Sequence, residues 1–266
     1  MKELIPIRQG GNRKLWYVAL LGAALASGPV SGAEGIDADA DKILKSMSAY
    51  LGGTKAFSVN ADIDLEVVTT AGQKVQLSSY ATVVLERPSK FKIARKGVIA
   101  DAAFIYDGNS LTLFGKNLNA YAEVEVPGTI DDAILAYELE TGIAAPGADL
   151  LFANPYTVLS SGVNSGVNLG TAYIDGIECH HLAFREDKVD WQLWVQAGDT
   201  PLPMKYVITS KWQTAAPQYE IRYRDWDTSP NIPAGEFTVS PPEGAEKLGT
   251  IVVNEMGEFA STEESQ

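Results

Sequence analysis

The segment Phe57–Val67, FSVNADIDLEV, alternates between apolar and polar side chains at every position. Successive side chains of a β-strand point to opposite faces, so this period of two predicts a strand with one face in the core and the other in solvent. The following residues, Thr70–Gln73, contain a glycine and predict a hairpin that returns through Lys74–Arg87. This part of the chain is therefore expected to form antiparallel β-sheet.

The same period of two recurs along most of the chain. Asp107–Asn109, with a central glycine, is a turn sequence between two of the resulting strands. A single antiparallel sheet of about eleven strands must curl to cover its own apolar face. The further predicted strands are Phe91–Val98, Ala102–Tyr106, Ser110–Phe114, Tyr121–Val126, Thr171–Ile174, Ile177–Arg185, Val189–Ala197, Leu202–Trp212 and Gln218–Trp226.

Helical spacing of apolar residues occurs in three places. Ile36–Leu51 has apolar residues every three or four positions, acidic residues at its start and two glycines after its end. Thr129–Thr141 and a shorter helical segment within Gly147–Leu159 lie in the middle of the chain. Ser160–Gly170, SSGVNSGVNLG, is expected to be a loop, since neither a lysine nor a helix follows that would make it a phosphate-binding loop.

These elements predict the α+β class, with a single highly curved antiparallel sheet and helices covering its concave face. The strands before the helices would form one half of the curl, and the strands after them would form the other half. The domain is expected to span residues 34–249. The acidic, polar tail at residues 250–266 is expected to be disordered.

The first 33 residues have the pattern of a secretory signal peptide. Four basic residues precede a short apolar run, Leu15–Ala26, and small residues at 31–33 resemble a cleavage site. The run is short for a membrane span, although an uncleaved N-terminal anchor is the alternative interpretation. We expect cleavage near Ala33, export to the periplasm and no stable membrane insertion of the mature protein.

The charge of the mature chain excludes some partners. Loss of the first 33 residues would change the formal net charge from −13 to −16, because that segment holds four basic residues and one acidic residue. A surface this acidic repels nucleic acid and anionic lipid headgroups, so nucleic acid is not an expected partner. Cys179 is the sole cysteine, so no intramolecular disulfide can form.

No motif for catalysis, metal binding or a cofactor is apparent. Cys179, His180 and His181 are the one cluster with metal-ligand atoms, but on a strand His180 points away from the other two. Tetrahedral zinc needs further ligands, so a buried thiol beside surface histidines is the alternative to a metal site. No G-x-S-x-G nucleophile motif occurs, and the carboxylate pairs are typical of a solvated acidic surface. The sequence therefore predicts no enzyme, no metal and no cofactor.

Residues 81–97, ATVVLERPSKFKIARKG, read as two strands joined by a Pro-Ser turn. On the first strand the apolar face ends in Arg87, and on the second Phe91 and Ile93 share a face with Arg95. Two interpretations of these faces and of the later aromatic-rich strands are open. They are an ordinary core, or the wall of a cavity for a long apolar ligand.

Two sets of segments carry a resemblance to known proteins. LERPSKFKI (85–93) and FIYDGNSLTLF (104–114), followed by a short acidic helix, resemble the lipoprotein-carrier fold of Gram-negative bacteria. The later segments YIDGIECHHLAFRE (173–186), VDWQLWVQAGDTPLPMKYVIT (189–209) and PQYEIRYRDWDTSPNIPAGEFTVSPPEGA (217–245) resemble a family of predicted periplasmic proteins of unknown function. That family is assigned to the same fold, although this chain is longer than the carrier and differs from it in its C-terminal half.

The resemblance implies a half-open β-barrel with helices as a lid over its concave side. In the lipoprotein carrier, the arginine of the Arg-Pro motif bonds backbone groups of the lid, and Arg87 is the matching residue. The alternative is that Arg87 caps a strand end and extends into water. The expected cavity wall is Ile63, Leu65, Val83, Leu85, Phe91, Ile93, Trp191, Leu193, Ile208, Ile221 and Tyr223, and the expected lid residues are Ile134, Leu139, Leu150 and Leu151.

The leading hypothesis is a non-enzymatic periplasmic carrier for a lipid, an acylated lipoprotein or another long apolar ligand. The alternative is a protein-interaction module with a filled barrel, whose acidic outer face binds a periplasmic or envelope protein. A hydrolase with carboxylates at the mouth of a cleft is the third hypothesis. An elongated apolar cavity would favour the carrier, and a filled interior would favour the interaction module.

Overall fold

The computed structural model of the protein describes residues 35–98, 101–250 and 253. The predicted signal peptide, residues 1–33, and most of the predicted C-terminal tail lie outside these residues. Within the described part, no helix is long and apolar enough to cross a membrane.

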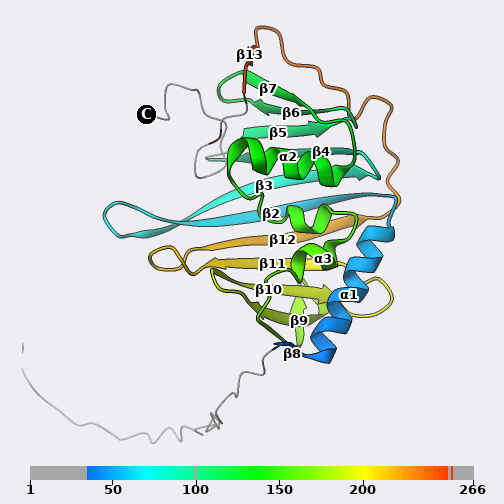
Figure 1. The fold of residues 1–266 in the computed structure, drawn as a ribbon, viewed down its shortest axis with the longest axis vertical. Helices are drawn as coiled ribbons and strands as arrows, with labels where there is room; N and C mark the ends of the chain where they lie inside the picture. Colours follow the sequence, from blue (N-terminus) through cyan, green and yellow to red (C-terminus); the bar gives the residue numbers. More distant parts are fainter. Residues whose placement is uncertain (1–34, 99–100, 251–252, 254–266) are drawn as a thin grey trace, which may run out of the picture. The chain divides into compact units, whose positions relative to one another are not determined.

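A single sheet of thirteen strands dominates the described residues (Figure 1). Its order is β1-β8-β9-β10-β11-β12-β2-β3-β4-β5-β6-β7-β13, so the strands that follow the helices return to pair with the first hairpin. The two short outermost strands pair in parallel with β8 and β7 and not with each other, and every other pair is antiparallel. The sheet is therefore open, which confirms the predicted half-open architecture.

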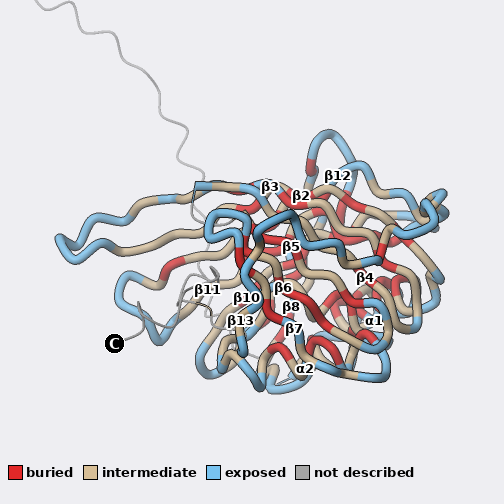
Figure 2. Tube along the Cα trace, turned by 90° about the horizontal axis from the view of Figure 1, so that it is seen from above, coloured by how far each residue is buried: buried red, intermediate tan, exposed pale blue. Residues whose placement is uncertain are grey.

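The strand bounds follow the sequence period closely. The strands are β1 Gly35–Ile36, β2 Ala56–Val68, β3 Lys74–Glu86, β4 Lys90–Gly97, β5 Asp101–Tyr106, β6 Ser110–Gly115, β7 Ala120–Glu125, β8 Ser165–Ile174, β9 Ile177–Arg185, β10 Val189–Gln196, β11 Pro203–Ser210, β12 Gln218–Asp227 and β13 Glu246–Leu248. On β2 the predicted alternation is observed, because Phe57, Val59, Ala61 and Ile63 are buried and the residues between them are not. The tip of the long β2–β3 hairpin is exposed (Figure 2).

The helices lie on one side of the sheet, over its concave face (Figures 1 and 2). They are α1 Ala38–Gly53, α2 Ile130–Thr141, the 3₁₀ helix η1 Ala148–Leu151 and α3 Pro155–Leu159. Thr129 and Asp132 form a reciprocal capping box at the start of α2, which satisfies backbone donors that the helix leaves unpaired. Burial of Leu44, Met47 and Leu51 shows which face of α1 packs on the core.

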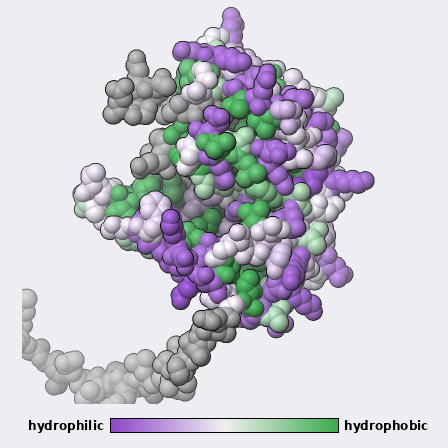
Figure 3. All heavy atoms as spheres, in the orientation of Figure 1, coloured by the Kyte–Doolittle hydropathy of each residue, from purple (hydrophilic) through white to green (hydrophobic). Residues whose placement is uncertain are grey.

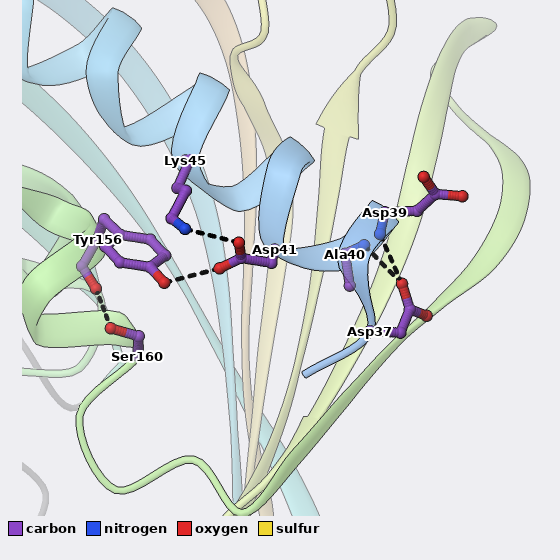
Figure 4. Close-up of polar contacts among 7 residues, drawn as sticks. All are labelled: Asp37, Asp39, Ala40, Asp41, Lys45, Tyr156 and Ser160. Atoms are coloured by element: carbon purple, nitrogen blue, oxygen red, sulfur yellow. Dashed lines mark hydrogen bonds and ion pairs between the residues drawn. The ribbon is translucent and has the colours of Figure 1, made fainter. Parts of the chain in front are cut away.

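Side-chain contacts cap the start of α1 and fix this helix to α3 (Figure 4). The Asp37 carboxylate caps α1 by accepting from the backbone N–H groups of Asp39 and Ala40. The Tyr156 hydroxyl of α3 donates to Asp41 of α1 at 2.7 Å, and the ammonium group of Lys45 lies 2.7 Å from the other oxygen of that carboxylate. These hydrogen bonds, led by the one from Lys45, lower the pKa of Asp41 below its ordinary value.

The prediction of a loop over Ser160–Gly170 is wrong in its second half. Strand β8 begins at Ser165 and pairs with β9 as far as Ile174. The glycine content concealed this strand, because Gly166 lies against the ring of Phe184, and Gly170 has a φ of +105° at a register shift in the pairing. A β-bulge accommodates the left-handed backbone that glycine favours.

The two glycines at the end of α1 provide a matched test of how tightly this helix packs against η1 and α3. A Cβ on Gly52 would lie 2.5 Å from the Ala153 carbonyl oxygen, whereas a Cβ on Gly53 would have no atom within 4 Å. We expect Gly52→Ala to lower the free energy of unfolding by about 2 kcal/mol through overpacking against backbone. We expect Gly53→Ala to raise it by about 0.5 kcal/mol, because alanine is the better helix former.

Chemical denaturation of the wild type and the two variants checks this expectation. Equal stability of the two variants would contradict the close approach of α1 to residue 153.

Candidate ligand cavity

An apolar cavity with a volume of about 250 Å³ lies between the concave face of the sheet and the segments that cover it. That volume is close to the lower end of the range for small-molecule pockets, roughly 300 Å³. Its lining is Phe57, Val59, Ala61, Ile63, Leu65, Ala81, Val83, Phe91, Ile93, Arg95, Ala102, Phe104, Leu111, Ala133, Ile134, Tyr137, Ile143, Ala144, Ala145, Pro146, Gly147, Ala148, Leu150, Leu151, Tyr219, Ile221, Tyr223 and Trp226. The interior of the sheet is therefore not completely filled by side chains.

Alternate residues of neighbouring strands form the floor of the cavity. On β2 every second side chain from Phe57 to Leu65 contributes, which corresponds to a length of roughly 26 Å at about 3.3 Å per residue. Strands β3, β4, β5 and β12 add their own alternate residues beside it. The cavity wall is therefore long and apolar, and it follows the direction of the strands.

The cover of the cavity consists of α2 and residues 143–151, which we call the lid. On α2, Ala133, Ile134 and Tyr137 face the cavity. Gly147 approaches the wall so closely that a Cβ there would lie 2.4 Å from the Cδ1 atom of Ile221. Figure 3 shows this side of the molecule, with apolar side chains in view among hydrophilic ones.

Arg87 connects the sheet to the lid. Its Nη1 group donates to the Leu151 carbonyl oxygen at 2.9 Å, and within the described residues its buried Nε and Nη2 atoms have no hydrogen-bond partner. Burial lowers the pKa of the Arg87 guanidinium from its ordinary value, and the charge of Asp131 opposes that change. Asp131 itself accepts from the Ala153 N–H at 2.8 Å, so residues 151–153 are held from both α2 and Arg87.

Asp149 is a lid carboxyl that turns toward the sheet. The hydroxyl of Tyr206 on β11, which is buried, donates to it over 3.4 Å. Burial raises the pKa of Asp149 to about 6, against the opposite effect of this hydrogen bond, and the charges of Glu138 and Glu186 add to the increase. The lid therefore contains a group that changes its charge near neutral pH.

Some of the predicted wall residues line the cavity, and others lie outside its lining. Ile63, Leu65, Val83, Phe91, Ile93, Ile221 and Tyr223 line the cavity, as do the predicted lid residues Ile134, Leu150 and Leu151. Leu85 is fully buried but lies outside the lining. Leu139 is 84% exposed, so its prediction as an inward lid residue is wrong. It is two residues past Tyr137 on a helix of 3.6 residues per turn, which turns it away from the sheet.

Trp191, Leu193 and Ile208 also lie outside the lining, so their prediction as wall residues is corrected. Trp191 and Leu193 are buried in the core, and Ile208 is partly buried against it. Trp191 stacks on Phe184 with ring centroids 4.0 Å apart and donates its indole N–H to Glu186 at 2.8 Å. The stacked rings fill the space next to Trp191.

Several lining residues were not predicted as site residues. Phe57, Val59 and Ala61 share the alternating face of Ile63, so the period of two could have identified them. Arg95 could also have been identified, because it lies two residues after Ile93 on the same strand and therefore on the same face. Residues 143–148 and Trp226 carry no such signal. Trp226 enters the cavity after a register shift in β12, next to Asp225 with a φ of +56°.

The cysteine and histidine cluster has ordinary contacts. Cys179 is buried, and burial raises the pKa of its thiol. His181 stacks on Trp194 at 4.0 Å and lies 2.9 Å from the side-chain oxygen of Gln192. Across the part of the chain that the structure describes, no three His, Cys, Asp or Glu side chains are grouped closely enough to hold a metal ion.

A protein-family model described as "Predicted periplasmic protein (DUF2092)" matches residues 40–250. The chain belongs to this family. The match confirms the resemblance of the later segments, and the description of the family agrees with the predicted periplasmic location. The comparison with curated proteins finds no match.

Solved structures resemble the chain in outline. An uncharacterised conserved protein from Thermus thermophilus has 9% identity and a TM-score of 0.49, with coverage of 79% of this chain and 99% of that chain. A LolA superfamily protein from Nitrosomonas europaea has 13% identity, a TM-score of 0.39 and coverage of 75% and 97%. Lipoprotein LppX from Mycobacterium tuberculosis has 13% identity, a TM-score of 0.41 and coverage of 73% and 97%. These similarities carry no information about a ligand of this chain.

The position of Asp149 predicts a pH-dependent stability. Its pKa is about 6 in the folded protein, against 3.8 for an unperturbed aspartate side chain, so folding favours the protonated form. This preference stabilises the folded protein fully below about pH 4, and the stabilisation is lost as the pH rises through 6. Asp149→Asn removes this titration. We therefore expect the stability of the variant, relative to wild type, to increase by about 1–2 kcal/mol between pH 4 and pH 7.5.

Urea unfolding of both proteins at several pH values checks this expectation. A difference between the two proteins that is constant with pH would show that Asp149 titrates like an exposed carboxyl.

Proposed function

We propose that the protein is a non-enzymatic periplasmic carrier that holds the apolar chain of a lipid or acylated ligand in the cavity beneath the lid. The observation that carries the proposal is the long apolar cavity between the sheet and a lid of short segments. Each buried CH₂ group of a bound chain would contribute about 0.8 kcal/mol. The interaction-module hypothesis requires a filled interior, so the cavity supports the carrier over that alternative.

A ligand covered by the lid can enter and leave only if the lid moves. The lid is made of short elements, and residues 143–147 between α2 and η1 have no regular secondary structure. Segments of this kind need little free energy to open, because they have few backbone hydrogen bonds of their own. We infer that opening exposes the cavity while the sheet stays unchanged.

Arg87 is the proposed latch of the closed state. A hydrogen bond from a charged donor contributes roughly 1.5–3 kcal/mol, and the bond to the Leu151 carbonyl oxygen is of this kind. The two buried nitrogen atoms without a described partner reduce that gain, since buried donors without acceptors are unfavourable. The closed lid would then be only slightly preferred, as a carrier requires.

The latch predicts the behaviour of Arg87→Leu. The variant loses the donor to the lid and keeps an apolar side chain at the same position, so the lid should be open more often. We expect a fluorescent fatty-acid probe to associate roughly tenfold faster than with wild type, which corresponds to about 1.4 kcal/mol. Stopped-flow fluorescence measures the rate, and circular dichroism verifies the fold.

Arg185→Leu is the matched control. The Arg185 side chain is 70% exposed on β9 and forms an ion pair with Asp190, and it is not among the residues that line the cavity. We expect this variant to bind the probe at the wild-type rate. If Arg87→Leu also kept the wild-type rate, Arg87 would not be a latch, and if no protein bound the probe the carrier proposal itself would fail.

A further inference from the structure

One charged side chain enters the apolar cavity. Among the described residues of the lining, Arg95 alone carries a charge. It lies on β4, where Phe91, Ile93 and Arg95 alternate toward the cavity. A guanidinium is protonated at all physiological pH values, so a permanent positive charge faces the site.

The guanidinium of Arg95 is only partly satisfied by the protein. Its Nε group donates to the Ser79 hydroxyl oxygen at 3.0 Å, and within the described residues its buried Nη2 atom has no hydrogen-bond partner. The centre of the guanidinium lies 6.0 Å from the ring centroid of Tyr219. The Ser79 bond and the ring therefore fix the direction of the side chain, while part of its donor capacity stays free.

The surroundings leave room beside this group. The residues that pair with Arg95 on the adjacent strands are Ala81 and Ala102, and Ala81 pairs in turn with Ala61. All three alanines line the cavity. Small side chains across three strands about 4.8 Å apart create free space at the level of the guanidinium.

The other arginines of the described sheet have acceptors. Arg185, Arg222 and Arg224 form ion pairs with carboxylates outside the cavity. In the described part of the chain no carboxylate lies within ion-pair distance of Arg95 (its contacts are a hydroxyl and an aromatic ring). A cation among apolar groups without a counter-charge is unfavourable, and an anion from a ligand would remove that penalty.

We propose that the cavity binds a single-chain amphiphile with an anionic end group, a carboxylate or a phosphate, and that Arg95 binds this end group. The inference rests on the carrier function proposed above. The chain of the ligand would lie along β4 from Arg95 toward Phe91, a distance of about 13 Å over four residues. A cavity of about 250 Å³ suits one acyl chain better than two.

The test compares three ligands with the same chain length: palmitate, palmitoyl lysophosphatidate and the neutral hexadecanol. Each displaces a neutral apolar fluorophore, 1-N-phenylnaphthylamine, so that the binding of the probe does not depend on Arg95. We expect wild type to bind one or both anionic ligands at least about tenfold more tightly than hexadecanol, as a charge-assisted hydrogen bond implies. The more tightly bound anion identifies the end group.

Substitution of Arg95 gives the second part of the test. Arg95→Met should remove the preference for the anion and leave the affinity for hexadecanol unchanged, and Arg95→Lys should keep part of the preference. Arg222→Met, which removes an arginine paired with Asp175 outside the cavity, should behave as wild type.

Equal affinity of wild type for the anionic and neutral ligands would overturn the inference and leave the carrier function standing. An anion preference that survives Arg95→Met in a folded variant would overturn it as well. If wild type bound none of the three ligands, both the inference and the carrier function would be overturned.

Discussion

An open, strongly curved sheet has an apolar concave face that cannot cover itself, and the rest of this structure follows from that constraint. The two halves of the sheet meet the constraint differently. In the half that contains β9 and β10, large rings such as Phe184 and Trp191 stack and fill the space. In the half around β2 to β5, the inward positions include Ala61, Ala81 and Ala102, so side chains do not fill the space above these positions. The cavity is the space that remains.

The fold was largely accessible from the sequence because its main signal is periodicity. The alternation of Phe57–Val67 defines the strand and its buried face, and the register with β3 then follows from the short turn between the two strands. Periodicity failed where glycine replaced the inward side chains, as at Gly166 in β8. There the pairing with β9 determines the strand, and a pattern of side chains cannot show it.

The site was less accessible, because a buried apolar face looks the same in sequence whether it meets another side chain or a cavity. Trp191 and Val83 have the same type of pattern, yet Trp191 lies in solid packing and Val83 lines the cavity. The difference depends on what lies above each residue, which is set by the path of the chain from α2 to α3. Arg95 was visible as a charge on an apolar face. Its Nη2 atom, which has no partner among the described residues, and its alanine neighbours become apparent only from the three-dimensional structure.

In the proposed carrier, the sheet with α1 and α3 is the rigid part and the lid is the movable part. Ladders of backbone hydrogen bonds hold the strands of the sheet together. Contacts such as that between Tyr156 and Asp41 fix α1 to α3. The lid is fixed by few contacts, among them those of Arg87 and Asp131 near its end. A fixed wall with a weakly held cover is the arrangement that allows uptake and release without unfolding of the domain.

The central claim is that the space beneath the lid holds a single apolar chain. Native mass spectrometry of the protein, expressed with its signal sequence and purified from the periplasm without detergent, tests this claim most directly. The account predicts a species with one bound molecule, whose mass after release is that of a single-chain anionic lipid. Ligand-free protein that also takes up no palmitate when the lipid is added would contradict it.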